Sequence, residues 1–229
     1  EKNAVQLNDT HPTIAIVELL RQLIDEYHLD NQEAFQIVRT TFSYTNHTVL
    51  PEALEKWSVD LIGKLLPRHM ELIYLMNHFF MEEVKSRFPN NYEKMSTLSC
   101  IQEGSPKMVR MANLCIISSH TVNGVAKIHS DLIRSHLFKD FDEYYPGKFT
   151  NVTNGVTPRR WIHCAFRELS DLLTQYYGNN DWLGELSLLE ELPDILAKKG
   201  KTDEFLVNLK QAKLKAKKRL ADWVKENCN

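Results

Sequence analysis

Four polar clusters that follow short strand-like runs constrain the fold of this chain more than any other feature. They span residues 8–11, 46–48, 119–123 and 154–160, and most of them precede a segment with helical spacing. In an open α/β sheet the carboxyl ends of parallel strands share one edge where ligands bind, so clusters distant in sequence converge there. The pattern therefore predicts an α/β fold with a polar site at that edge, although turns and helix caps alone also favour asparagine and aspartate.

Apolar spacing predicts the elements of the first half. Strands are expected at residues 4–8 and 41–45, and helices from Pro12 to about His28 and near residues 31–40. The long segment between Pro67 and Pro89 is apolar on nearly every side, which predicts a buried helix. Residues 89–106 are rich in asparagine, serine, glycine and proline, so we expect an exposed excursion there.

The second half begins with the compact apolar run Leu114–Ile117, which predicts a strand covered on both faces. A helix is expected after Gly124, with Ile128 on its apolar stripe and His129 as a core histidine whose hydrogen bonds are satisfied. From Pro158 the chain is predicted to be helical. Its last helix is basic and amphipathic, which we interpret as a solvated face.

The segment Phe149–Trp161 contains amides, a glycine turn and two guanidinium groups at one strand-to-helix corner. We expect Thr157 to cap the helix and Pro158 to form its first turn. Free N–H groups at such a helix start favour an anion or a hydroxyl oxygen. The corner therefore suits a polyhydroxylated or phosphorylated ligand.

Composition excludes several classes of function. A net charge of −2 with 25% charged residues gives no field that would attract nucleic acid or a membrane surface, and the apolar runs are too short to span a bilayer. The four cysteines are far apart, which favours reduced thiols in the cytoplasm over a disulfide framework or a zinc ribbon. The chain begins at Glu1 with a strand-like run, so we expect it to be part of a longer polypeptide.

Other catalytic chemistries have weak support in the sequence. The histidines form no recognised ligand pair, so no metal site is predicted. Glu52 and Glu55 resemble the carboxylate pair of a glycosidase, but their spacing makes them neighbours on one surface, and we expect a solvated face. Carbohydrate binding, by contrast, suits clusters of Asn, His, Asp, Ser and Thr, whose groups both donate to and accept from sugar hydroxyls.

Four motifs together resemble one family. They are Gln6–Pro12, Tyr44–Glu55, Ser119–Val125 and Phe149–Trp161, and they occur in the same order in α-1,4-glucan (glycogen, starch or maltodextrin) phosphorylases. The resemblance implies the GT-B glycosyltransferase fold, with the active site in a cleft between two domains. Residues 1–157 would then belong to the Rossmann-like N-terminal domain, and residues 158–229 to a helical segment leading to the C-terminal cofactor domain.

The resemblance also implies a reaction, in which phosphate cleaves the terminal α-1,4-linked glucose of a glucan and releases glucose 1-phosphate with retention of configuration. His47 matches the catalytic histidine beside the glucosyl unit, whose backbone carbonyl faces the developing positive charge. Asn154 and Val125 match residues around the sugar 6-hydroxyl. Asp9 and His11 match the polar wall on the glucan side of the cleft.

Further site residues follow from the same resemblance. Asn46 joins the substrate-binding set, and Trp161 matches an aromatic residue packed against pyridoxal 5'-phosphate, whose phosphate acts as a proton relay. A separate glucan storage site of the animal enzymes is matched more weakly, because Ser105, Pro106 and His78 depart from its usual pattern. Its candidate residues are Tyr74 and Asn77, on the long predicted helix, and Glu103 and Lys107, which otherwise belong to an exposed polar loop.

Several parts of such an enzyme have no counterpart in these residues, notably the Schiff-base lysine and the basic groups that hold substrate phosphate. We therefore expect this chain alone to be inactive, with the rest of its polypeptide as a partner, in a cytoplasmic homodimer. Two alternatives remain at this point. One is a non-catalytic carbohydrate-binding module, and the other is a GT-B transferase that uses a nucleotide sugar.

Overall fold

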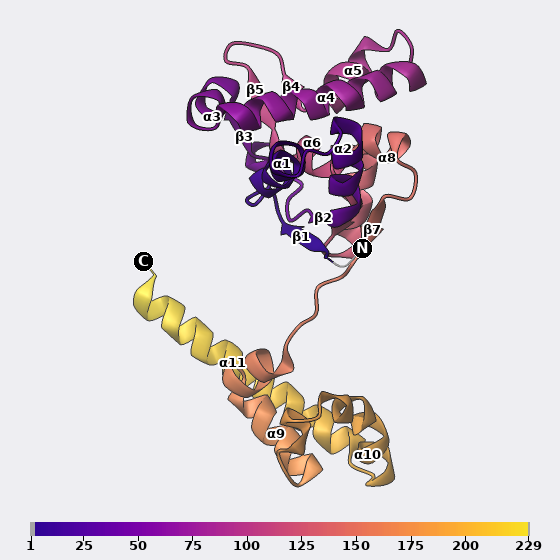
Figure 1. Ribbon diagram of the computed structural model, residues 1–229. Helices are drawn as coiled ribbons and strands as arrows, with labels where there is room; N and C mark the ends of the chain where they lie inside the picture. Colours follow the sequence, from indigo (N-terminus) through magenta and orange to yellow (C-terminus); the bar gives the residue numbers. More distant parts are fainter. Residues whose placement is uncertain (1–2, 229) are drawn as a thin grey trace. The chain divides into compact units, whose positions relative to one another are not determined.

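The computed structural model describes residues 3–228, which form two compact units divided between Asn154 and Gly155. Each unit is described by itself (Figure 1). The first is a mixed α/β unit, and the second is helical. The sequence-based expectation of an α/β fold with a parallel sheet and a helical extension is confirmed at this level.

The central sheet of the first unit has four strands that are all parallel. In spatial order they are β1 (Val5–Asn8), β2 (Phe42–Thr45), β6 (Ser119–Gly124) and β7 (Phe149–Asn151). Leu7, Tyr44 and Val122 are fully buried in adjacent strands of this sheet. Parallel pairing needs a crossover between neighbours, and the helices between the strands provide it.

Helices and helical turns flank the sheet, and helices such as α1 (Ile14–Arg21) and α2 (Asn31–Thr41) bury one of their own faces. Asp30 caps the start of α2, because its Oδ1 accepts the backbone N–H of Gln32 at 2.8 Å and that of Glu33 at 3.4 Å. The other elements are η1 (Gln22–Glu26), α6 (Met111–Ile117), α7 (Lys127–Leu132), η3 (Ile133–Leu137) and α8 (Lys139–Tyr144).

A second layer covers the helices on one side of the sheet, with α4 (Pro67–Arg87) as its longest element (Figure 1). The prediction of a buried helix holds for one face of α4, where Ile73, Met76 and Phe80 are fully inaccessible, whereas its other face is exposed. The other members are η2 (Pro51–Ala53), α3 (Val59–Leu65), α5 (Tyr92–Leu98) and the antiparallel strands β3 (Lys56–Ser58), β5 (Met108–Arg110) and β4 (Ile101–Gln102).

Some sequence-based expectations about these elements are wrong. Leu114–Ile117 lies in the helix α6, and the polar residues 119–123 that we placed after a strand form the strand β6 itself. Residues 89–106 are mostly exposed or partly exposed, as expected, but they also contain α5 and the buried Leu98 and Cys100. Ile128, which we placed on an apolar stripe, is 74% exposed.

The second unit has a small core of its own, centred on the fully buried Trp182. Gly178 ends its first long helix in a left-handed conformation, with φ of 86°. The elements are η4 (Arg159–Cys164), α9 (Arg167–Tyr177), η5 (Asp181–Leu183), η6 (Leu186–Glu191), α10 (Leu192–Lys198) and α11 (Thr202–Asn227). Between residues 3 and 228, no helix is both long and apolar enough to cross a membrane.

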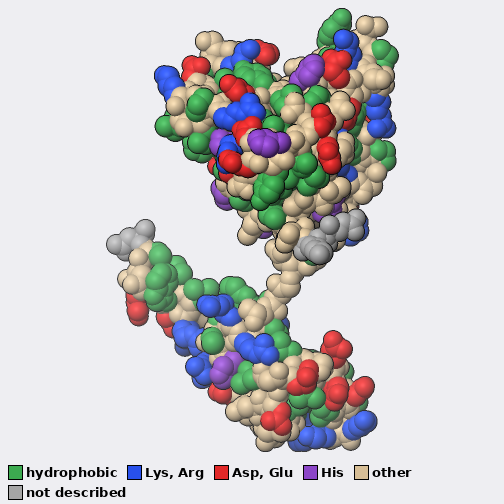
Figure 2. Space-filling model, in the orientation of Figure 1, with side chains coloured by type: hydrophobic (Ala, Val, Ile, Leu, Met, Phe, Trp, Pro, Cys, Tyr) green, Lys and Arg blue, Asp and Glu red, His purple; other side chains and the backbone are tan. Residues whose placement is uncertain are grey.

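The last helix, α11, presents apolar side chains to solvent. Leu206, Leu214 and Leu220 are each more than half exposed, and lysines lie between them. Figure 2 shows hydrophobic and basic side chains near one another on the surface of the second unit. The expected solvated face is thus present, but it includes more apolar surface than the sequence interpretation allowed.

Candidate functional site

The carboxyl edge of the sheet brings together three of the four polar clusters. Backbone hydrogen bonds join the loops there, from Asp9 N to Thr45 O at 3.0 Å and from Asn46 N to Asn123 O at 2.9 Å. Val152 N donates to Gly124 O at 3.2 Å, which adds the loop after β7. We call this edge, with residues 8–11, 46–48, 123–125 and 151–154, the polar rim.

His47 is held by the loop of the neighbouring strand. Its Nε2 lies 2.6 Å from Oδ1 of Asn8. An amide oxygen only accepts, so the Nε2–H of His47 donates to it. This contact fixes the orientation of the ring, which sequence analysis did not foresee because Asn8 and His47 are far apart in the chain.

Asn46 is buried, and its side chain supports the loop. Its amide nitrogen donates to the Tyr44 hydroxyl at 3.1 Å, and its amide oxygen accepts the Thr48 N–H at 3.1 Å. The backbone carbonyl of Asn46 also accepts a hydrogen bond from Nε2 of His129 at 3.0 Å. His129 is therefore satisfied, as expected, although it is half-buried rather than part of the core.

Val125 and Asn154 lie next to each other on the rim. The backbone N–H of Asn154 donates to the Val125 carbonyl at 3.0 Å, and the Asn154 side chain is exposed. Just before them, Gly124 has no room for a side chain, because an added Cβ would lie 2.5 Å from Ser130 Oγ and 2.8 Å from His129 Cδ2. A close approach of α7 to the end of β6 thus sets the position of Val125.

The loop after β1 is held by side chains at both ends. Asp9 has a left-handed backbone, with φ of 66°, and its Oδ1 accepts the Thr10 N–H at 2.7 Å. The buried Thr10 hydroxyl donates to Oε2 of Glu55 at 2.5 Å, and the exposed His11 borders a cavity of about 230 Å³ with Glu55. The expectation that Glu55 belongs to a plain solvated face is therefore wrong, because its carboxylate holds the rim.

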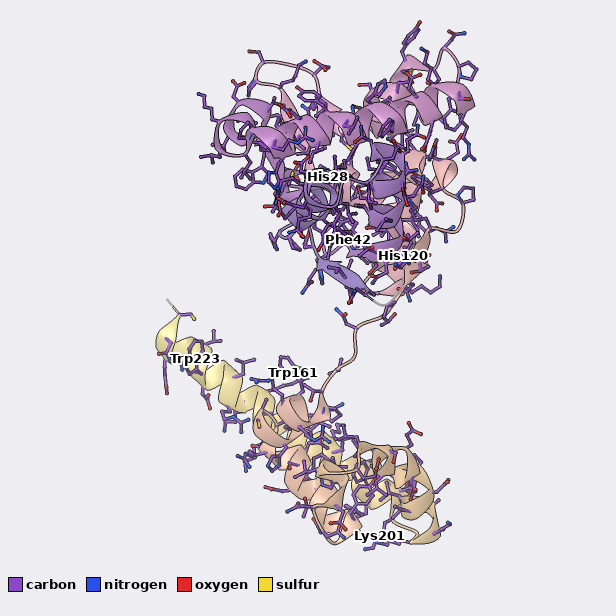
Figure 3. All side chains as sticks on the ribbon, viewed as in Figure 1. His28, Phe42, His120, Trp161, Lys201 and Trp223 are labelled. Atoms are coloured by element: carbon purple, nitrogen blue, oxygen red, sulfur yellow. The ribbon has the colours of Figure 1, made fainter. Side chains whose placement is uncertain are left out.

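The strand-to-helix corner differs from its prediction. Thr157 makes no side-chain cap, since the helical turn η4 begins after Pro158. The Arg159 guanidinium donates to the carbonyls of Leu183, at 2.6 Å, and Gly184, at 3.3 Å, so it stabilises the second unit. Trp161 lies in η4 of that unit with 60% of its surface exposed (Figure 3).

The candidate storage residues lie on α4 and the β4–β5 connection. Asn77 uses its side-chain oxygen to accept the Cys100 N–H at 2.7 Å, so it anchors the chain after α5. Lys107 and Glu103 form an exposed ion pair at 2.9 Å, and Tyr74 is 40% exposed. The structure therefore leaves an accessible ion pair and phenol here, and the side-chain oxygen of Asn77 also holds the chain after α5.

Other reactive groups near the sheet are inert. Burial raises the pKa of the Cys115 thiol to about 12, so it is protonated at neutral pH and is not a nucleophile. Among residues 3–228, no group of three or more His, Cys, Asp or Glu side chains is placed to hold a metal ion. What the rim offers is a ring of amide, imidazole, carboxylate and backbone groups, which suits a neutral polyhydroxylated ligand.

A parallel sheet with this rim defines an α/β protein with a candidate ligand site at the carboxyl ends of its strands. The family model described as carbohydrate phosphorylase matches residues 1–229, and the chain belongs to this family. Neither a binding module nor a nucleotide-sugar transferase is favoured by this match.

Curated relatives agree with the family match. The chain is 49% identical over 227 residues to a glycogen phosphorylase of Saccharomyces cerevisiae, covering 97% of this chain and 25% of the yeast protein. It is 46% identical to "Alpha-glucan phosphorylase 2, cytosolic" of Arabidopsis thaliana, covering 97% of this chain and 26% of that relative. It is 45% identical to the liver form of glycogen phosphorylase of Homo sapiens, covering 96% of this chain and 26% of that relative. The chain thus spans about a quarter of the length of these relatives.

Proposed function

We propose that these residues are part of an α-glucan phosphorylase, which uses inorganic phosphate to release glucose 1-phosphate from the end of an α-1,4-glucan. The observation that carries the proposal is the polar rim, where His47, Val125 and Asn154 extend from neighbouring strands of one parallel sheet. The names of the relatives support glycogen or another α-glucan as the substrate.

In this proposal the rim surrounds one glucosyl unit. The backbone carbonyl of His47 stabilises positive charge that develops on the sugar, since a dipole already in position lowers a barrier without reorganising. Asn154 and Val125 border the 6-hydroxyl, and Asp9 and His11 face the glucan. Asn46 acts indirectly, because its buried amide holds the His47 loop.

The GT-B arrangement and pyridoxal 5'-phosphate belong to the same proposal. The cofactor's phosphate would supply proton transfer at the reacting phosphate. Trp161 is the residue of this chain assigned to it, and an indole with 60% of its surface exposed fits a contact with a flat ring. We further propose a homodimer in the cytoplasm, a compartment that the printed name of the Arabidopsis relative supports.

An assay of the complete enzyme tests the reaction. Glucose 1-phosphate is measured with glycogen, starch or maltodextrin as the glucan, with and without pyridoxal 5'-phosphate. We expect product that requires both inorganic phosphate and the cofactor. Absence of product with every glucan would refute the enzymatic assignment.

A rim variant tests the position of the sugar. In Asn154→Ala, we expect discrimination between a glucosyl unit and its 6-deoxy analogue to fall by about 1–3 kcal/mol, as for loss of one buried hydrogen-bond partner. The ratio of kcat/KM values for the two substrates gives this quantity. Asn208→Ala, in α11 of the second unit, is the matched control, and equal losses on both substrates in Asn154→Ala would contradict the assignment.

A further inference from the structure

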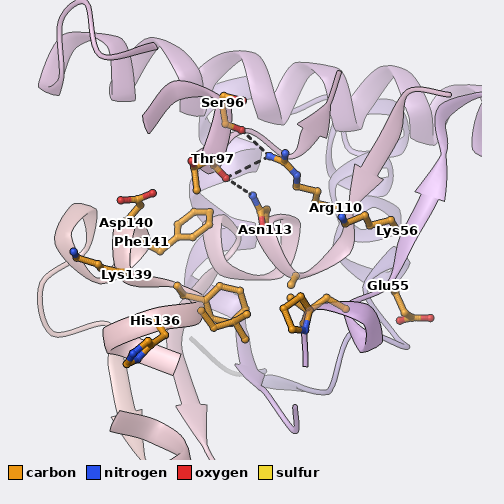
Figure 4. Close-up of a pocket in the computed structure, with 15 residues that line it drawn as sticks. Glu55, Lys56, Ser96, Thr97, Arg110, Asn113, His136, Lys139, Asp140 and Phe141 are labelled. Carbon is orange, nitrogen blue, oxygen red and sulfur yellow. Dashed lines mark hydrogen bonds between the residues drawn. The ribbon is translucent and has the colours of Figure 1, made fainter. Parts of the chain in front are cut away.

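A second cavity in the first unit, of about 400 Å³, lies apart from the residues assigned to the sugar (Figure 4). Its walls come from the segment after His47, the end of α5, the start of α6 and the turn between η3 and α8. Glu55 borders it, whereas His47, Val125 and Asn154 do not. Its size is sufficient for a small organic molecule.

At this cavity, Arg110 has the most hydrogen-bond donors without a partner among the described residues. Its Nη1 donates to the carbonyls at the end of α5, with Ser96 O at 2.6 Å and Ser99 O at 3.2 Å. Its Nε and Nη2 have no partner within residues 3–228. Those two nitrogens form the edge of a guanidinium that binds an oxyanion through two parallel hydrogen bonds. Burial lowers the pKa of Arg110, and no carboxylate among the described residues forms an ion pair with its guanidinium.

Neighbouring charges favour an anion as well. Lys56 and Lys139 border the cavity, and neither forms an ion pair with another described residue. Of the two carboxylates at the cavity, Glu55 is engaged by the Thr10 hydroxyl. In Figure 4 the Glu55 carboxylate lies at the far end of the view from Asp140, with Arg110 between them.

The remaining wall is apolar. Leu54 and Pro51 border one side of the cavity, and the rings of Phe138 and Phe141 border another. A flat ring is well suited to such a wall, because aromatic faces and edges pack against it without unpaired polar atoms. Asn113 adds a fixed polar group, since its amide nitrogen is held by the carbonyls of Thr97, at 3.0 Å, and Ser99, at 2.9 Å.

We propose that this cavity binds a small organic anion, a flat apolar ring bearing a phosphate or carboxylate, with the Arg110 guanidinium as its charge partner. Binding of this anion should affect the polar rim through Glu55, because Glu55 borders both this cavity and the one beside His11. The binding site does not depend on the glucan reaction, so its test is independent of the proposed enzyme activity.

The test is a titration of the 229-residue protein with phenyl phosphate, inorganic phosphate and benzyl alcohol, followed by amide NMR. We expect saturable binding of phenyl phosphate, stronger than that of either half-molecule, with shifts at Arg110, Asn113 and the Thr10 amide. Absence of saturable binding would overturn the site. An unshifted Thr10 amide at saturation would overturn the link to the rim.

Variants of Lys56 and Lys139 test the site without removing the hydrogen bonds from Arg110 to the carbonyls at the end of α5. Lys56→Gln combined with Lys139→Gln is expected to weaken phenyl phosphate binding about tenfold, as for loss of charged partners. Lys64→Gln, an exposed lysine on α3, is the matched control. Arg110→Lys keeps the charge but loses the paired geometry, and should also weaken binding. Unchanged affinity in the Lys56/Lys139 double variant would exclude this cavity, whatever the stability of the Arg110 variant.

Discussion

Gly124 shows how a single residue sets the geometry of the rim. A Cβ at this position would lie within 2.9 Å of the Ser130 Cα, in addition to the closer contacts with Ser130 Oγ and His129. The carbonyl of the same residue accepts hydrogen bonds from the Val152 N–H and from the Asn123 side chain. Any side chain would therefore displace both α7 and the loop after β7.

Gly124→Ala is accordingly expected to lower the free energy of unfolding by about 1–3 kcal/mol, the usual cost of overpacking. Urea unfolding of the first unit gives this quantity. Gly63→Ala, in α3 of the same unit, is the control, because an added Cβ there would make only an ordinary contact with Met70 Cγ at 3.9 Å. Equal stability of the two variants would contradict the close contact between β6 and α7.

Lys148 is a cation held away from water at the opposite end of β7. Its Nζ donates to the Ile116 carbonyl at 3.0 Å and lies 3.3 Å from the centre of the Tyr145 ring. Burial, with the nearby Arg39, lowers the pKa of Lys148 to about 7. The folded protein thus releases this proton more easily than the unfolded chain does.

This difference predicts a rise in stability with pH. Above pH 7 the unfolded chain binds the Lys148 proton and the folded protein does not, so the free energy of unfolding should increase by about 1 kcal/mol per pH unit between pH 7 and 8.5. Lys148→Met should remove this contribution, and Lys127→Met, on an exposed lysine, should retain it. Urea titrations at several pH values compare the slopes, and identical slopes in wild type and Lys148→Met would refute the prediction.

At the scale of elements, sequence patterns predicted most of the helices and strands of the first half of the chain. They failed where a fully buried segment has no alternation of polar and apolar residues. Alternation and helical spacing identified β1, α1, α2, β2 and α4. The apolar run Leu114–Ile117 predicts a strand, yet it lies in the helix α6, every residue of which is buried. A short buried helix and a covered strand show the same unbroken apolar run. Glu55 was misjudged because its partner, Thr10, is brought to it only by the folded chain.

The start of α2 offers a test of local capping. Asp30→Ala removes the acceptor for the Gln32 and Glu33 N–H groups, and we expect a loss of about 1 kcal/mol in the free energy of unfolding. Asp30→Asn retains an acceptor oxygen and should keep most of this stability. Thermal or urea unfolding distinguishes them, and a stability of Asp30→Ala equal to that of wild type would rule out the cap as a stabilising contact.

At the scale of the molecule, the two units have separate cores. The core of the first surrounds the parallel sheet, and that of the second contains Trp182, with Leu173 and Phe205 from two of its helices. Residue patterns gave the helical character of the second unit, but not which of its apolar side chains form a core, because several on α11 face solvent.

Trp182→Ala is expected to destabilise the second unit by about 3–5 kcal/mol, as for large core truncations. Hydrogen exchange should accelerate in residues 167–227 and remain unchanged in the sheet of the first unit. Trp223→Ala, which removes an indole that is 56% exposed, is the control. Equal acceleration in both units would show that they unfold together.

The strand order of the sheet has a consequence for biosynthesis. β2 ends at Thr45, but its central neighbour β6 begins only at Ser119, and β7 follows later still. A nascent chain can pair β2 with β1, but it must leave the other edge of β2 unpaired while the ribosome supplies the intervening helices. Pairing of strands that are distant in sequence slows folding and prolongs the lifetime of aggregation-prone intermediates. Expression at lower temperature or with added chaperones should therefore raise the yield of native protein.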